Sequence, residues 1–166
     1  MSKQLSQSIT AKLEQNLSQY KFSERYDEVT ENIVGIVKKP WKPLQRVFGG
    51  HGIAAVITVP ETITERESLK AFFKHMRKEI TSKYVGYAAY KSSHSFVVLV
   101  CPHELFTTAS GIASELKDRT GLHMNIIQGV VLVDSQTREV ASDYTRPLQY
   151  KGEYNAVLSA ANSEVK

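Results

Sequence analysis

The first twenty residues carry apolar side chains at close to every fourth position. Leu5, Ile9, Leu13 and Leu17 recur with Ser, Gln, Lys and Glu between them, a spacing that places them along one side of a helix. We therefore predict an amphipathic helix within residues 1 to 22, which has to dock its apolar stripe on another surface. The charged residues 22 to 31 indicate a connection.

From residue 32 onward the apolar runs are short and rich in β-branched residues, which is typical of strands. We predict strands at residues 32–37, 53–59, 84–90, 96–101, 126–133 and 139–144. Helical spacing of apolar residues predicts helices at 65–82 and from Pro102 to Gly121. The short polar turn at 91–94 indicates that strands 84–90 and 96–101 form an antiparallel hairpin.

The order of elements from Ile53 is strand, helix, strand, strand, helix, strand. Short connections fold this order most simply as an α/β (α+β) ferredoxin-like βαββαβ sandwich, with an extra N-terminal helix and flanking strands. A profilin-like or roadblock-like α-β-α arrangement, with a central antiparallel sheet between helices, is the alternative. We expect an N-terminal helix in residues 1–22, a single α/β domain in 23–150 and a flexible C-terminal tail in 151–166.

Two of the predicted strands are apolar at consecutive positions, in residues 53–57 and 96–101. Such runs are typical of strands buried on both faces. Two core helices cover one face of the sheet. The other face requires the N-terminal helix, the loop at 38–52 with its Trp41 and Phe48, or a second subunit.

Composition restricts the class of protein. The 166 residues are 42% hydrophobic, enough for one domain with its own core. No apolar run reaches the roughly 18 residues of a membrane span, and the polar N-terminus does not resemble a secretory signal. The lone Cys101 excludes an internal disulfide and a cysteine-based zinc site. We expect a cytoplasmic protein, and the sequence predicts neither a cofactor nor a metal site.

Positive charge gathers in two stretches, although the net charge is only +4. Lysine and arginine beside an aromatic ring can bind phosphates by charge and bases by stacking, and a basic helix face can follow a phosphate backbone. The alternative is a solvated surface, with Trp41 capping the sheet. The candidate nucleic-acid or anion-binding residues are Lys38, Lys39, Trp41, Lys42, Arg46, Lys70, Lys74, Arg77 and Lys78.

A polar loop separates the helix predicted from Pro102 to Gly121 from the following strand. In it, Arg119 could bind an anion, His123 could transfer a proton and Asn125 could hydrogen-bond a planar ligand. The same segment also has the composition of a helix end followed by a turn. Both interpretations remain open.

Cys101 ends an apolar strand directly before a predicted helix, where the helix dipole and His103 could lower its pKa. Phosphate-directed enzymes with this arrangement place an arginine six residues after the cysteine, and here that residue is Thr107. This mismatch favours a buried structural cysteine. His94 and His103 could lie at one end of the sheet, but no motif supports a metal or catalytic pair.

Three functions follow from these patterns. We favour a non-catalytic binding or assembly protein that works through protein–protein contacts and self-association, because the strands need cover on both faces and no complete catalytic set is present. The alternative is a basic nucleic-acid-binding accessory protein. The third is a cysteine-dependent enzyme that uses Cys101 and His103, so whether the protein is an enzyme is left open, with no catalytic residue assigned.

Overall fold

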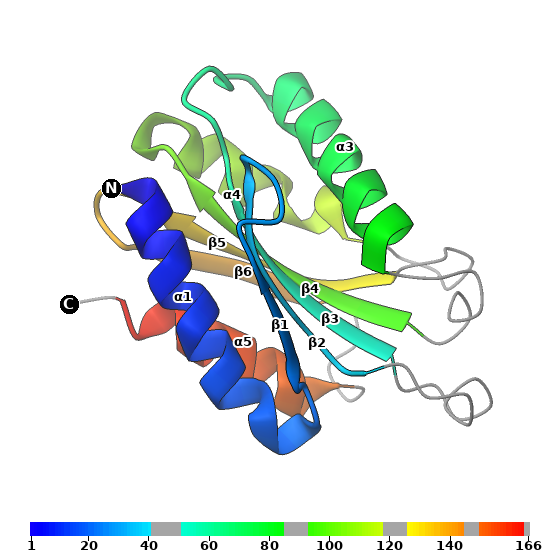
Figure 1. Cartoon of the computed structure of the whole chain (residues 1–166). Coiled ribbons are helices and arrows are strands. Elements are labelled where there is room, and N and C mark those ends of the chain that lie inside the picture. Colours follow the sequence, from blue (N-terminus) through cyan, green and yellow to red (C-terminus); the bar gives the residue numbers. More distant parts are fainter. Residues whose placement is uncertain (41–50, 85–92, 118–125, 145–149, 165–166) are drawn as a thin grey trace.

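The structure, a computed structural model, describes residues 1–40, 51–84, 93–117, 126–144 and 150–164 (Figure 1). Its elements in chain order are α1 (Ser2–Leu17), the 3₁₀ helix η1 (Ser18–Tyr20), β1 (Glu24–Asp27), β2 (Ile33–Lys38), β3 (His51–Thr58), α3 (Arg66–Tyr84), β4 (Ser93–Cys101), α4 (His103–Leu116), β5 (Ile126–Asp134), β6 (Val140–Tyr144) and α5 (Lys151–Asn162).

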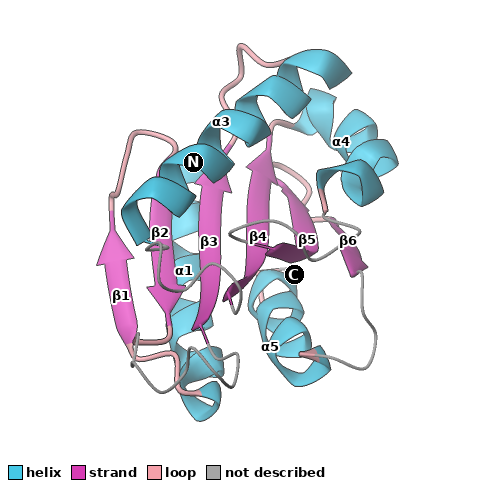
Figure 2. Ribbon diagram, turned by 90° about the vertical axis from the view of Figure 1, so that its right-hand side faces the viewer, coloured by secondary structure: helices cyan, strands magenta, loops and turns pink. Residues whose placement is uncertain are grey.

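The six strands form one mixed sheet in which their spatial order is their chain order, β1 to β6. β3, β4 and β5 are mutually parallel, whereas the other neighbouring pairs are antiparallel. Helices α3 and α4 make the two parallel connections and lie on one face of the sheet, while α1 and α5 lie on the other (Figures 1 and 2). The result is a three-layer α-β-α arrangement.

This arrangement confirms the mixed α/β class but not the ferredoxin-like connectivity. The predicted hairpin is wrong, because both edges of β4 are occupied by the parallel strands β3 and β5. Tyr84 closes α3 rather than opening a strand: it lies four residues after Ile80, so it continues the buried side of the helix. Residues 85–90 lie outside the described residues. Helices on both faces match the layering of the α-β-α alternative, although the centre of its sheet is parallel here.

Two elements differ from expectation near the chain ends. Residues 24–27, expected to be a connection, form the exposed edge strand β1, whose charged residues pair in register with β2. The expected flexible tail is instead the helix α5, which buries Tyr154, Val157 and Ala161. Its apolar stripe is built mainly from alanine, so the segment resembles a small polar tail in composition while still packing on the sheet.

The sheet is covered on both faces by the chain itself. One hydrophobic core lies between the sheet and the α3 and α4 side, and the second includes α1 and α5. Helix α1 approaches β2 closely: a Cβ atom added at Gly35 would lie 2.3 Å from the Thr10 side chain. The predicted N-terminal helix therefore provides the missing cover, together with α5. Trp41 and Phe48, the other proposed cover, lie outside the described residues.

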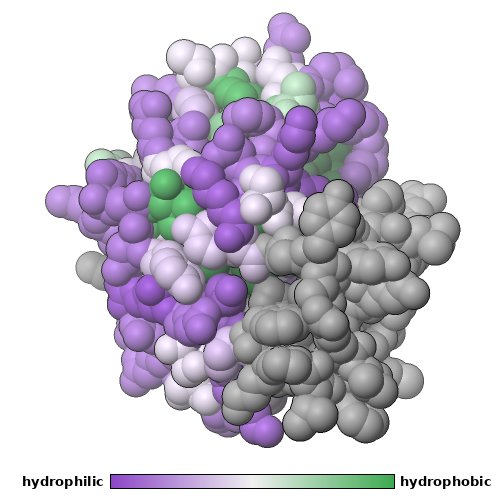
Figure 3. Space-filling model, turned by 45° about the vertical axis from the view of Figure 1, so that its right-hand side comes forward, coloured by the Kyte–Doolittle hydropathy of each residue, from purple (hydrophilic) through white to green (hydrophobic). Residues whose placement is uncertain are grey.

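The described surface is largely polar. Only Met1 and Tyr26 are large hydrophobic residues with exposed side chains among the described residues. On the face in Figure 3, hydrophobic colour appears only as small separate patches among hydrophilic residues. Within the described ranges no helix combines the length and the apolar character needed to cross a bilayer.

Candidate functional site

A polar cleft lies where the chain leaves the three parallel strands. Glu61 follows β3, residues 102–104 follow β4, and Ser135 and Gln136 follow β5. The cleft encloses about 610 Å³, including the solvent at its mouth. Open α/β sheets bind their ligands outside the carboxyl ends of their strands, so the position of this cleft is that of a ligand site.

His103 and Asp134 form a hydrogen-bonded pair in this cleft. Asp134 is the last residue of β5 and is 1% exposed, whereas the His103 side chain, at the start of α4, is half exposed. The His103 Nδ1 atom lies 2.6 Å from Asp134 Oδ2. One member of the pair is therefore anchored in the fold, and the other is open to solvent and to a ligand.

Asp134 is held as a carboxylate. Burial alone would raise its pKa, but hydrogen bonds from His103 and from the backbone N–H groups of Gln136 and Thr137 outweigh that effect and lower it. An ionised carboxylate can only accept hydrogen bonds, so His103 Nδ1 carries the proton of this pair. In the neutral imidazole the Nε2 atom is then left with a lone pair, the form suited to accept a proton.

Cys101 is not the nucleophile of this site. Its side chain is fully buried in the core beneath α4. Burial, helped by the nearby charge of Asp134, raises the pKa of the thiol to about 12. The thiolate needed for nucleophilic attack is therefore disfavoured, which removes the basis of the cysteine-dependent enzyme. His103 finds its partner in Asp134, and His94 lies at the other end of β4, so the two histidines are not brought together.

A second polar cluster is buried at the opposite end of the central strands, near the start of β4. The Glu153 carboxylate, on α5, lies 2.5 Å from Lys39 Nζ and 2.5 Å from His94 Nε2. The exposed fractions of these side chains are only 8% for Glu153, 14% for Lys39 and 2% for His94. The cluster ties the first turn of α5 to β4 and to the end of β2.

Aromatic rings enclose this buried cluster. Tyr150 stacks on His94 with ring centroids 3.7 Å apart, and Phe96 meets the same imidazole edge-on. Lys39 Nζ lies 5.2 Å from the centre of the Phe22 ring. Burial lowers the pKa of His94 more than the Glu153 carboxylate raises it. The packing leaves no open face for a ligand among the described residues, so we interpret the cluster as an anchor for α5.

The predicted basic residues are only partly available. Lys39 is bound in the cluster, Lys38 lies 3.6 Å from Glu24, and Lys70 lies 2.5 Å from Glu115. Lys74 and Lys78 are exposed on α3. Lys38 Nζ also lies 3.5 Å from the backbone oxygen of Tyr84, so the first basic stretch meets the end of α3, the helix that carries the second. Outside the described residues lie Trp41, Lys42 and Arg46 of the basic loop and Arg119, His123 and Asn125 of the polar loop.

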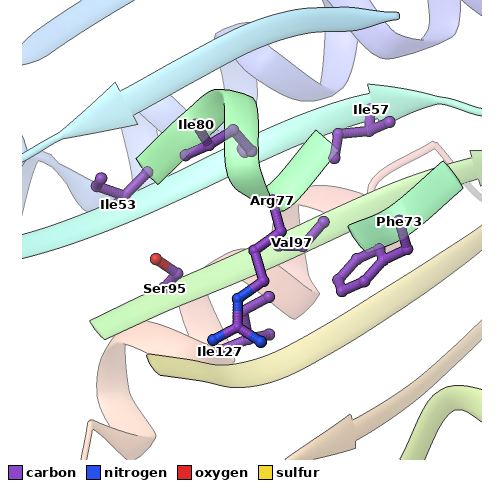
Figure 4. A pocket seen from close by; sticks show the side chains of 9 residues that line it. Ile53, Ile57, Phe73, Arg77, Ile80, Ser95, Val97 and Ile127 are labelled. Atoms are coloured by element: carbon purple, nitrogen blue, oxygen red, sulfur yellow. The ribbon is translucent and has the colours of Figure 1, made fainter. Parts of the chain in front are cut away.

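Arg77 lies at a narrow apolar recess between α3 and the sheet. Ile53, Phe73 and Ile127 are among its walls, and it encloses about 260 Å³, including its opening. Figure 4 shows the Arg77 side chain reaching from α3 across the recess towards Ile127 at the start of β5. The aliphatic stem of Arg77 thus covers apolar surface, and its predicted phosphate contact stays a prediction.

Sequence analysis missed Asp134 and Glu61 as parts of a site. Asp134 has the composition of a turn residue, and it does accept hydrogen bonds from the backbone N–H groups of residues 136 and 137. The available signal was its position directly after a strand that is apolar on both faces. Among the described residues, no three His, Cys, Asp or Glu side chains are placed to hold a metal ion. Comparisons with protein-family models, curated proteins and solved structures found no match.

Proposed function

We propose that the protein binds a small polar molecule in the cleft at the carboxyl ends of β3, β4 and β5, and exchanges a proton with it through His103. The observation that carries this proposal is the 2.6 Å contact between the exposed imidazole and the buried Asp134 carboxylate at the cleft. The Glu, His, Ser and Gln side chains that line the cleft can all hydrogen-bond a small polar ligand.

In the proposed proton transfer, His103 Nε2 accepts a proton from a hydroxyl or ammonium group of the ligand. The imidazole then carries a positive charge, and Asp134, already ionised, stabilises that charge at Nδ1. The proton returns from Nε2 to the ligand or to solvent. Asp134 is thus a positioning residue: it holds the imidazole in one orientation and one tautomer.

The tautomer provides a direct test by NMR. We expect the imidazole ¹⁵N shifts of His103 to report a protonated Nδ1 in the neutral ring, and Asp134→Asn to move the proton to Nε2, because an amide can donate to Nδ1. His75, an exposed histidine on α3, is the internal control and should not change. Equal populations of the two His103 tautomers in the native protein would contradict the proposal.

Ligand binding is tested separately, with a screen of polar metabolite-sized compounds observed by backbone amide shifts. We expect compounds that bind to change the amide shifts of Glu104, Ser135 and Gln136. His103→Ala should weaken their binding, while His75→Ala should leave it unchanged. Hits that gather elsewhere, or that bind His103→Ala equally well, would refute the proposal.

Self-association and nucleic-acid binding remain predictions. The argument for a partner was the uncovered sheet face, and α1 and α5 now cover that face. The argument for nucleic acid rested on the two basic stretches, of which Lys74 and Lys78 are the exposed described members on α3. The geometry therefore gives stronger support to ligand binding in the cleft at the carboxyl ends of β3, β4 and β5.

A further inference from the structure

We infer that the cleft is specific for a ligand that carries a protonated amine. This inference rests on the proposed function and adds the chemical class of the ligand. It starts from the charge of the cleft: Glu61 and Glu104 are exposed and line it, and none of the described lining residues is Lys or Arg.

The buried Asp134 adds a third negative charge, which His103 balances only when its imidazole is protonated. Helix α4 begins at His103, and the start of a helix is equivalent to roughly half a positive charge. That partial charge does not cancel the two exposed carboxylates. The cleft therefore attracts cations and disfavours anions, although the whole chain has a net charge of +4.

Hydrogen-bonding capacity points the same way. The two glutamates present acceptor oxygens only, and the neutral His103 presents its Nε2 lone pair, since Nδ1 donates to Asp134. Ser135 and Gln136, which also line the cleft, can donate as well as accept, so acceptors outnumber donors among the lining side chains and suit a ligand with several donors. A primary ammonium group has three N–H donors and a positive charge, whereas a carboxylate or phosphate has none.

The test uses three probes of similar length on the full chain: 1,4-diaminobutane, 1,4-butanediol and succinate. Binding is measured at low salt by the amide shifts of Glu104, Ser135 and Gln136. We expect the diamine to shift these residues at the lowest concentration, the diol weakly, and succinate not at all. Added salt should weaken the binding of the diamine, because salt screens the interaction between partly exposed charges.

A charge-matched pair of variants separates the cleft from the protein as a whole. Glu61→Gln/Glu104→Gln should lower the affinity for the diamine by about tenfold, the change expected for the loss of two partly exposed ion pairs. Glu14→Gln/Glu24→Gln removes the same charge from α1 and β1, both on other parts of the molecule, and should leave binding within about twofold.

The outcomes distinguish this inference from the proposed function. If succinate or the diol binds the cleft as well as the diamine does, the amine specificity is wrong while the ligand site stands. If both double variants lose the same affinity for the diamine, the amine specificity of the cleft is also wrong, since the effect then comes from the net charge of the protein. If none of the probes and no screened compound shifts the cleft residues, both proposals fail.

Discussion

Glu153→Gln should destabilise the protein strongly, because Glu153 is the centre of the buried cluster that fixes α5. Its carboxylate is 2.5 Å from both Lys39 Nζ and His94 Nε2. The amide has the same shape but no charge, so Lys39, 14% exposed, keeps a buried positive charge without its counter-ion. The amide also cannot accept from both partners as the carboxylate does.

The expected loss is about 3 kcal/mol in the free energy of unfolding. Removing one partner of a buried ion pair costs about 3–5 kcal/mol. We expect the lower end, because Lys39 keeps its contact with the Phe22 ring and has a small exposed fraction. For a chain of this size, such a loss lowers the melting temperature by about 10 °C.

Urea unfolding followed by circular dichroism measures this loss. Glu115→Gln is the matched control, since Glu115 also contacts two cations, Arg66 and Lys70, but at the surface. It should unfold close to the native protein. In Lys39→Met/Glu153→Met, which replaces both charges with apolar side chains, much of the stability should return. If Glu153→Gln is no less stable than Glu115→Gln, the cluster is not an anchor and the reasoning is wrong.

Three further predictions concern other parts of the fold. Stability should fall as pH drops below about 6.5, because the pKa of His94 is lowered on folding and the unfolded chain takes up a proton there that the folded chain does not; urea titrations at several pH values would contradict this if flat between pH 7 and 5. Cys101 should not react with a thiol reagent at pH 8 until urea unfolds the chain, because burial raises its pKa to about 12; rapid labelling of the native protein would exclude that. Gly111→Ala, on the open side of α4, should stabilise by about 0.5–1 kcal/mol, whereas Gly35→Ala should destabilise by about 1–3 kcal/mol because its Cβ meets Thr10 at 2.3 Å; equal effects in thermal unfolding would refute the close docking of α1.

The secondary structure was predictable where periodicity is strong. The stripe of α1 and the two-faced apolar runs of β3 and β4 are visible in the sequence and correspond to buried positions. The sheet order was not, because strand pairing depends on which face each connecting helix covers. Tyr84 shows the local ambiguity: tyrosine favours strands, but here it continues the inner side of α3.

The site was only half predictable, for a reason of distance along the chain. His103 was recognised beside Cys101, its neighbour in sequence, but its actual partner Asp134 lies 31 residues away. The cluster residue Glu153 lies 59 residues from His94 and 114 from Lys39, and it belongs to a segment expected to be a tail. Contacts of this kind exist only once the sheet brings strand ends together.

The second core of this fold is closed by helices from opposite parts of the chain. α1 ends at Leu17 and α5 begins only at Lys151, yet a hydrogen bond of 2.7 Å joins Ser8 to Glu164. During synthesis the strands can pair in the order in which they emerge, and α1 can dock on β2 and β3 as soon as those strands form. The part of α1 that packs against α5 is covered only after the chain has passed Lys151, so this second core is completed in two steps that are far apart in the sequence.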